Sequence, residues 1–151
     1  MKAVIPAAKK KDSLFPFSES TPAALLPVKG KALVEHNIRK LKNQGIDEIY
    51  IVANYKAEKF QEKFDERNDV NIVIQEELSG TAEALNTCNF IEEDFVVING
   101  DVIISENDIS RLIENHDGDV SILATDEKKP EKFGVLSIQN DEIIGLAEKP
   151  E

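Results

Sequence analysis

A glycine and a carboxylate follow a short apolar run at Asn99-Gly100-Asp101, where they could hold a metal ion. The apolar run, residues 95–98, is typical of a buried strand. A carboxylate at the end of such a strand offers a hard oxygen ligand, and Mg²⁺ that carries substrate phosphates usually takes one or two protein carboxylates. Asp101 is therefore a candidate metal ligand. A turn that merely ends the strand explains the same three residues equally well.

A second candidate is Gly80-Thr81, which lies between an apolar run and a helical pattern. A helix start presents unpaired backbone N–H groups and the positive end of the helix dipole, so Ser79-Gly80-Thr81 could hold an anion or the polar edge of a base. The structural alternative is that Thr81 is an N-cap and that Glu83 stabilises the first turn.

The third candidate is the basic loop Lys9-Lys10-Lys11. Three ammonium groups could attract a triphosphate as point charges, although this loop lacks the glycines that let a backbone approach phosphate closely. The neighbouring Asp12 opposes that interpretation. A solvated basic turn is the alternative.

The elements that must position these loops alternate between strand and helix patterns. Strands are predicted over residues 3–8, 48–53, 70–74, 95–98, 120–124, 134–138 and 143–147, and helices over 33–45, 57–64, 81–88 and around 109–113. The last two strands flank Gln139-Asn140-Asp141, a composition suited to a hairpin turn.

This alternation predicts an α/β fold, a Rossmann-like, doubly wound and mostly parallel sheet with helices on both faces. Because ligands bind outside the carboxyl ends of the strands in such sheets, the three candidate loops are where we expect the site. No linker or repeat interrupts the sequence, so we expect one domain over residues 1–151.

Composition narrows the classes of function. The 151 residues are 41% hydrophobic and 31% charged, which is typical of a folded domain. A net charge of −11 argues against nucleic acid as a partner, and the absence of a run of about twenty apolar residues argues against a membrane span. The single cysteine, Cys88, cannot form an internal disulfide, so we expect a reducing, cytoplasmic setting.

Taken together, the motifs resemble those of the sugar-1-phosphate nucleotidylyltransferases, also called sugar-nucleotide pyrophosphorylases. The resemblance covers nearly the whole chain, and its pieces are Met1 to Ala8, Thr21-Pro22, Leu25 to Lys31, Gly45 to Ile49, Gly80 to Ala84, Asn99-Gly100-Asp101, Phe133-Gly134-Val135 and Glu148-Lys149-Pro150. It implies the nucleotide-diphospho-sugar transferase fold.

The resemblance also implies a reaction, in which a sugar 1-phosphate attacks the α-phosphate of a nucleoside triphosphate to give an NDP-sugar and pyrophosphate, with Mg²⁺ as cofactor. By carry-over, the nucleotide would be bound by Ala7, Ala8, Gln75, Gly80, Thr81, Asn99 and Asp101, with Asp101 also holding the metal. Gly134, Glu148 and Lys149 would face the sugar phosphate.

The departures from the family pattern lie in the first loop. The family signature resembles Gly-x-Gly-x-Arg-Leu followed by a Pro-Lys pair, but Lys9 and Lys11 replace the glycines, Ser13 the arginine and Ala23 the lysine. Removing one preorganised charge-stabilising group commonly costs about 10²–10³ in rate. The sequence therefore predicts weak or lost activity, or alternatively a non-catalytic regulatory or scaffolding subunit that binds a nucleotide or a sugar nucleotide.

The family usually continues beyond Glu-Lys-Pro, whereas this chain stops at Glu151. The resemblance therefore implies a fold truncated at the C-terminus, with a second metal-binding carboxylate absent from the sequence. A truncated sheet has an edge that needs covering. We accordingly expect a homo-oligomer or a partner chain.

Overall fold

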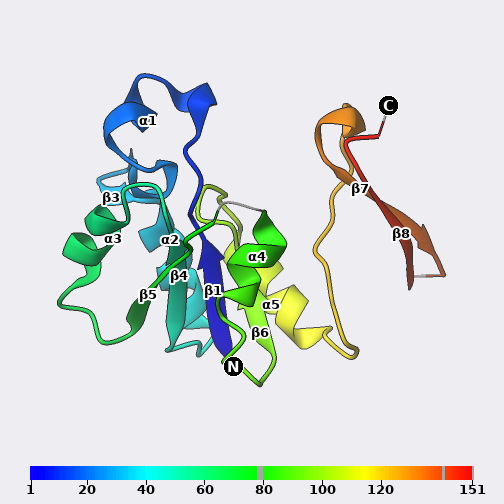
Figure 1. Cartoon of the computed structure of the whole chain (residues 1–151). Coiled ribbons are helices and arrows are strands. Elements are labelled where there is room, and N and C mark those ends of the chain that lie inside the picture. Colours follow the sequence, from blue (N-terminus) through cyan, green and yellow to red (C-terminus); the bar gives the residue numbers. More distant parts are fainter. Residues whose placement is uncertain (78–79, 141, 151) are drawn as a thin grey trace. The chain divides into compact units, whose positions relative to one another are not determined.

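The computed structural model describes residues 1–77, 80–140 and 142–150, and the chain divides into two compact units, Met1–Glu114 and Asn115–Glu151. The single domain expected from the sequence stays a prediction. The elements of unit 1 (Figure 1) are β1 Lys2–Pro6, η1 Asp12–Leu14, α1 Phe17–Ser20, η2 Ala23–Leu25, β2 Pro27–Val28, β3 Lys31–Ala32, α2 Leu33–Asn43, β4 Ile49–Ala53, α3 Ala57–Phe64, β5 Val70–Ile74, α4 Thr81–Asn86, β6 Phe95–Val97 and α5 Glu106–Glu114.

Unit 1 is built on a four-stranded parallel sheet with the order β5-β4-β1-β6. The chain adds strands on one side of β1 as far as β5, and then returns to place β6 on the other side. The strand order therefore reverses beside β1, and in doubly wound sheets this switch point is where ligands bind. The predicted α/β, doubly wound and parallel architecture is confirmed.

The core of unit 1 has two layers because successive side chains of a strand point to opposite faces. Ala3 and Ile5 of β1 pack into a cluster that holds residues of α2, α3 and α5. Val4, between them, packs with Ala84 and Cys88 on the other face. Figure 1 shows α4 on one side of β1 and α2 on the other. The sheet is thus covered on both faces, which holds the ends of its strands in fixed positions.

Local signals in the sequence account for the boundaries of α2. Its first turn is stabilised because the backbone N–H of Ala32 donates to Oε2 of Glu35 at 2.7 Å. The helix ends at Asn43, and Gly45 follows with a φ of +78°, a left-handed conformation that glycine adopts without a Cβ penalty. The predicted C-terminal stop at Gly45 is confirmed.

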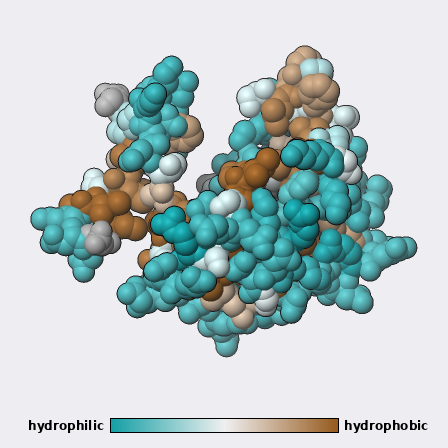
Figure 2. Space-filling view, turned by 180° about the vertical axis from the view of Figure 1, so that it is seen from behind, coloured by the Kyte–Doolittle hydropathy of each residue, from teal (hydrophilic) through white to brown (hydrophobic). Residues whose placement is uncertain are grey.

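Unit 2 consists of η3 Pro130–Lys132 and an antiparallel hairpin of β7 Gly134–Gln139 and β8 Glu142–Glu148. This confirms the predicted hairpin, although Asp141 of its turn lies outside the described residues. Several large apolar side chains of the hairpin are exposed, including Leu146 at 68%, and Figure 2 shows brown, hydrophobic surface there. The hairpin faces bury little apolar surface within the unit.

The predicted strand over residues 120–124 is wrong. These residues form no ladder with any other described part of the chain, and the side chain of Val120 is 73% exposed. An extended segment becomes a strand only when a neighbouring strand accepts and donates its backbone hydrogen bonds. The apolar pattern is present here, but no described strand pairs with it.

Other boundaries shift slightly. The helix predicted over 81–88 ends at Asn86, and the strand predicted over 95–98 ends at Val97. Within the described residues no helix has the length and apolar character needed to cross a membrane.

Candidate functional site

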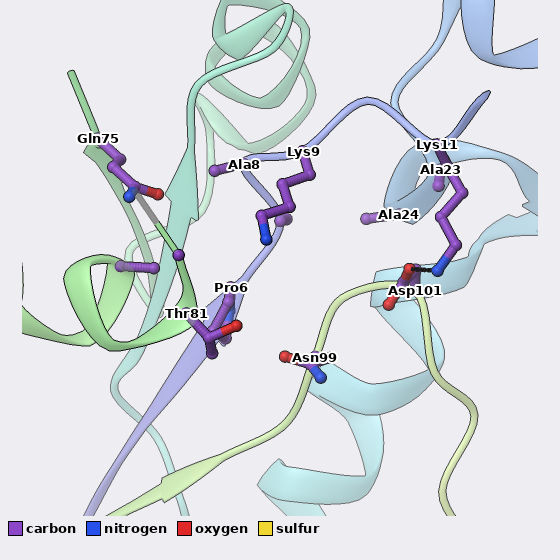
Figure 3. A pocket seen from close by; sticks show the side chains of 13 residues that line it. Pro6, Ala8, Lys9, Lys11, Ala23, Ala24, Gln75, Thr81, Asn99 and Asp101 are labelled. Carbon is purple, nitrogen blue, oxygen red and sulfur yellow. Dashed lines mark hydrogen bonds and ion pairs between the residues drawn. The ribbon is translucent and has the colours of Figure 1, made fainter. Parts of the chain in front are cut away.

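A pocket of about 200 Å³ opens in unit 1 where the loops after β1 and β6 meet the start of α4 (Figure 3). It is lined by Pro6, Ala7, Ala8, Lys9, Lys11, Ala23, Ala24, Gln75, Gly80, Thr81, Ala84, Asn99 and Asp101. The structure therefore brings together every residue that the sequence assigned to the nucleotide. Their convergence is a matter of geometry, and their roles stay predictions.

The parallel sheet positions this pocket by aligning the carboxyl ends of β1 and β6. The backbone N–H of Gly100 donates to the carbonyl of Pro6 at 2.9 Å, which joins the two loops. A Cβ at position 100 would lie 3.0 Å from Cβ of Ala7 and 3.1 Å from Cβ of Ala24. The loops approach this closely because residue 100 has no side chain, and the contact fixes the position of the adjacent Asp101.

Gln75 supplies a buried polar group directly after β5, with only 2% of its surface exposed. Its backbone N–H donates to the carbonyl of Ala53 at 2.9 Å, and its side-chain Nε2 donates to the carbonyl of Glu77 at 2.7 Å. Asn54 donates through Nδ2 to the backbone carbonyl of Gln75 at 2.7 Å. These bonds hold the carboxamide at the wall of the pocket.

The start of α4 differs from the sequence-based alternative in which Thr81 is the N-cap. Gly80 is the N-cap, with a φ of +134°, and its position has no side-chain capping bond. Residues with a Cβ rarely adopt this φ, so the turn into the helix occurs at the glycine. Thr81 becomes the first residue of the helix and lines the pocket, while Ser79 lies outside the described residues.

The three lysines of the first loop do not act alike. Lys9 and Lys11 line the pocket, whereas Lys10 does not and instead pairs through Nζ with Oε1 of Glu19 at 2.6 Å. The two lysines on either side of Lys10 thus share the pocket, while Lys10 is held by Glu19. This bond also raises the pKa of Lys10 and lowers that of Glu19.

Asp101, the candidate metal ligand, is occupied by a cation of the chain itself. The ammonium of Lys11 donates to Oδ2 of Asp101 in an ion pair across ninety positions of sequence, marked by the dashed line in Figure 3. Both side chains line the pocket, with 29% of the Asp101 side chain and 50% of the Lys11 side chain exposed.

A bound Mg²⁺ does not fit this donor set as it stands. Mg²⁺ that carries substrate phosphates is usually bound through one or two protein carboxylates, and a cation already paired with such a carboxylate competes with the metal. Asp101 is the sole carboxylate among the described lining residues, and Lys11 holds it. Across the described chain no group of three or more His, Cys, Asp or Glu residues is arranged to hold a metal ion.

The two positions where the family signature carries cations are neutral. Ser13 lies in η1 and is not among the residues that line the pocket, and Ala23 lines it with 5% of its surface exposed. The structure thus places one of the two substituted positions against the pocket.

The residues predicted to face a sugar phosphate lie in unit 2. Gly134 and Glu148 are register partners of the hairpin, and a Cβ at Gly134 would lie 3.3 Å from Oε2 of Glu148. Lys149 follows with a φ of +45°, and its Nζ lies 3.8 Å from Oε1 of Glu148. The three residues therefore form a local group within unit 2.

The model of the protein family described as "Nucleotidyl transferase" matches residues 2–151 of the chain. The chain belongs to the nucleotidyl transferase family. Members of this family generally depend on Mg²⁺, and the resemblance assigns Asp101 to the metal. In this nucleotidyl transferase chain Asp101 is instead paired with Lys11.

Related proteins support this placement among the nucleotidyl transferases. The chain is 38% identical over 152 residues to the bifunctional protein GlmU of Methanococcus maripaludis strain C5, covering 99% of this chain and 36% of the relative. It is 30% identical to a bifunctional sugar-1-phosphate nucleotidylyltransferase/acetyltransferase of Sulfurisphaera tokodaii, covering 100% of this chain and 37% of the relative. The chain thus spans little more than a third of the length of these relatives.

A solved structure shares the fold. The crystal structure of a Bacillus anthracis protein described as a glucose-1-phosphate thymidylyltransferase, in complex with a sucrose, superposes with a TM-score of 0.75 and 30% identity. The match covers 99% of this chain and 65% of that one. The nucleotide-diphospho-sugar transferase fold expected from the sequence is confirmed.

Sequence reasoning missed two features of the nucleotidyl transferase pocket. Ala24 and Ala84 line it but carry no chemical signal that could single them out. The sequence also does not predict the ion pair between Lys11 and Asp101, although it singles out each of the two residues as a candidate. The signal that could have found it is that each follows a strand, but the adjacency of β1 and β6 had to be known first.

Proposed function

We propose that the pocket of unit 1 binds a nucleoside triphosphate, and that the chain is the nucleotidyl transferase part of a protein that transfers NMP to a sugar 1-phosphate. The observation that carries the proposal is the convergence of the seven assigned residues on one pocket at the switch point of the sheet. The names of the related proteins from Sulfurisphaera tokodaii and Bacillus anthracis both include a sugar 1-phosphate as substrate, which supports the sugar 1-phosphate as acceptor.

In the proposed reaction an oxygen of the sugar 1-phosphate attacks the α-phosphorus. The bond from that phosphorus to the oxygen bridging the α- and β-phosphates breaks, and pyrophosphate leaves with the electron pair. Such chemistry depends mainly on positioning and on neutralising charge, with little covalent work for the protein. The chain must therefore hold the base and ribose, and place cations beside the phosphates.

The residues that line the pocket can both hold the nucleoside and place a cation beside the phosphates. Ala7 and Ala8 offer only methyl groups, so a nucleoside can approach the backbone at the end of β1. Gln75 and Thr81 offer hydrogen-bonding groups for a base, and Lys9 offers a cation for the phosphates. About 200 Å³ is below the roughly 300 Å³ at which ligand pockets usually begin. Part of the nucleotide must therefore extend outside the enclosed space.

We further propose that transfer by this chain is slow, because Ser13 and Ala23 leave the signature positions without charge. A second candidate, a non-catalytic subunit that binds a nucleotide or sugar nucleotide, is favoured by the same two residues beside an otherwise complete lining. In both cases Gly134, Glu148 and Lys149 are proposed to contact the sugar phosphate. A cytoplasmic location and a homo-oligomer or partner chain remain parts of this proposal.

The test is pyrophosphate release from ATP, GTP, CTP, UTP and dTTP with a set of sugar 1-phosphates and Mg²⁺. We expect slow turnover, raised about a hundredfold or more in Ser13→Arg/Ala23→Lys, since each such cation is commonly worth about 10²–10³ in rate. Ser20→Arg, which adds a cation at a residue outside the pocket lining, is the control and should change little. Calorimetric binding of a triphosphate without turnover in either protein would favour the non-catalytic subunit, and no binding at all would contradict the pocket assignment.

A further inference from the structure

The proposed function does not explain the ion pair between Lys11 and Asp101. Asp101 is the carboxylate that the family resemblance assigns to a metal, and Lys11 stands at a position where the family has glycine. Their side chains form an ion pair at the carboxyl ends of the neighbouring strands β1 and β6, between the loops that follow them. The lysine at this glycine position of the family signature thus pairs with Oδ2 of Asp101, a carboxylate oxygen for which a divalent cation would compete.

The surrounding contacts determine which lysine reaches Asp101. Lys10 is held outside the pocket by Glu19, and its Nζ lies 6.0 Å from the ring centroid of Tyr55. The hydroxyl of Tyr55 in turn donates to the backbone carbonyls of Ser18 and Glu19, both at 2.9 Å. With Lys10 anchored there and the backbone of Lys11 extended, Lys11 faces the opposite side of the loop, toward Asp101.

The charges of the lining make the pocket favourable for an anion without a metal. The described charged side chains that line it are Lys9, Lys11 and Asp101, which sum to +1 on a chain of net charge −11. Lys9 forms no ion pair with any residue in the described part of the chain. An ammonium has three N–H donors, so Lys11 can keep its bond to Asp101 and still donate to phosphate oxygens.

We propose that Lys11 takes the place of a divalent cation at Asp101, which makes the pocket a metal-independent binding site for polyphosphate. The identity of the ligand rests on the proposed function, but the competition between Lys11 and a divalent cation for Asp101 does not. A divalent cation at Asp101 would compete with Lys11 for Oδ2 and would be repelled by the ammonium charge. In this proposal the ammonium of Lys11 contacts both the Asp101 carboxylate and the phosphate. It thereby supplies the positive charge that the family resemblance assigns to a metal at Asp101.

The first experiment tests the competition with Mn²⁺ alone, in the full chain and without nucleotide. Mn²⁺ broadens nearby amide signals in ¹H–¹⁵N spectra, so the amides of residues 7–8 and 99–102 report binding at Asp101. In Lys11→Ala this broadening should begin at about tenfold lower Mn²⁺ than in the unmodified chain, because the substitution removes both a competitor and a repelling charge about 4 Å from the ion. Circular dichroism and the Tm confirm that each variant is folded.

Two controls separate this local effect from the general acidity of the chain. Lys10→Ala removes the same charge from the same loop but leaves the ion pair intact, so its broadening should resemble that of the unmodified chain. The double variant Lys11→Ala/Asp101→Asn should no longer show broadening at the lower Mn²⁺ concentration, because the carboxylate is gone. Equal broadening in the unmodified chain and Lys11→Ala, a gain that persists in the double variant, or no broadening at these amides in either protein would overturn the proposal.

The second experiment tests the metal-independent site, with inorganic triphosphate as a probe that carries no base. By calorimetry, the unmodified chain should bind it with an affinity that differs less than about threefold between Mg²⁺ and EDTA, since Lys9 and Lys11 supply the charge. Lys11→Ala should lose about tenfold in EDTA and recover part of it with Mg²⁺. Binding by the unmodified chain only when Mg²⁺ is present would overturn the inference. Failure to bind triphosphate under any condition would instead count against the proposed function, and the Mn²⁺ result would stand by itself.

Discussion

The two units of the chain contain similar apolar residues but use them differently. In unit 1 side chains such as Phe60 and Ile51 are fully buried between the sheet and its helices. In unit 2 Phe133 is 52% exposed and Leu146 is 68% exposed, although both belong to an apolar pattern of the same kind. A single two-stranded hairpin cannot bury its own faces, whereas a sheet covered on both sides can.

This difference in burial bears on the stability of each unit and on the support that each gives to the proposed site. The pocket is lined by residues of unit 1, where the covered sheet holds the loops after β1, β5 and β6 close to one another. The group of Gly134, Glu148 and Lys149 rests on a hairpin with little buried surface of its own. We therefore expect substitutions in unit 1 to change folding strongly and matched substitutions in unit 2 to change it little.

The largest contrast should come from a pair of identical substitutions, Phe60→Ala and Phe133→Ala. Phe60 has no exposed surface, so its truncation leaves a cavity and should lower the free energy of unfolding by about 3–5 kcal/mol. Phe133→Ala should stay within about 0.5 kcal/mol because its side chain is already half in water. Urea unfolding followed by circular dichroism measures both, as the chain has no tryptophan. Equal losses would show that the two units share one core.

A smaller contrast is expected between Gly100→Ala and Gly118→Ala. A methyl group at position 100 would press on Cβ of Ala7 and Ala24, and such overpacking should lower the free energy of unfolding by about 1–3 kcal/mol. Because Gly100 also positions Asp101, the variant should bind triphosphate more weakly. Position 118 has no atom within 4 Å of a new Cβ, so Gly118→Ala should unfold at the same urea concentration as the unmodified chain. A Gly100→Ala protein of unchanged stability and affinity would mean that the loops can separate without cost.

The smallest contrast concerns acid sensitivity, tested with Asp69→Asn and Glu148→Gln. The pKa of Asp69 lies well below its ordinary value, first because Arg67 donates two hydrogen bonds to it, at 2.8 and 2.6 Å, and then because Lys42 donates another at 2.6 Å. A lowered folded-state pKa contributes stability at pH values above the unfolded pKa of about 4 and loses it as the pH falls further.

Asp69→Asn should therefore destabilise the chain by about 1 kcal/mol at pH 7, a value reduced by the partial exposure of its partners. The deficit should shrink between about pH 4 and pH 2, because the unmodified carboxylate loses its advantage there. Glu148→Gln, which removes an exposed pair in unit 2, should leave the pH dependence of unfolding unchanged. Parallel pH curves for Asp69→Asn and the unmodified chain would show that this ion-paired cluster does not contribute to folding.

Much of unit 1 could be predicted from local patterns. The helix ending before Gly45 and the apolar runs at β4 and β5 have boundaries close to those predicted, because apolar periodicity and helix stops act over a few residues. Residues 120–124 have the same apolar character but form no strand, since strand formation depends on a partner that the pattern does not reveal. The N-cap of α4 was also misplaced by one residue, because Gly80 can adopt a φ that Thr81 cannot adopt as easily.

The sequence by itself determined the class of fold, the family and the loops in which the pocket residues occur, because these depend on local periodicity and on the order of short motifs. Only the tertiary structure decided which two of three adjacent lysines line the pocket and that Lys11 meets Asp101. The physical reason is that strand order brings together chain ends far apart in sequence. The direction of each side chain there is fixed by contacts such as those of Lys10 with Glu19, which no local pattern encodes.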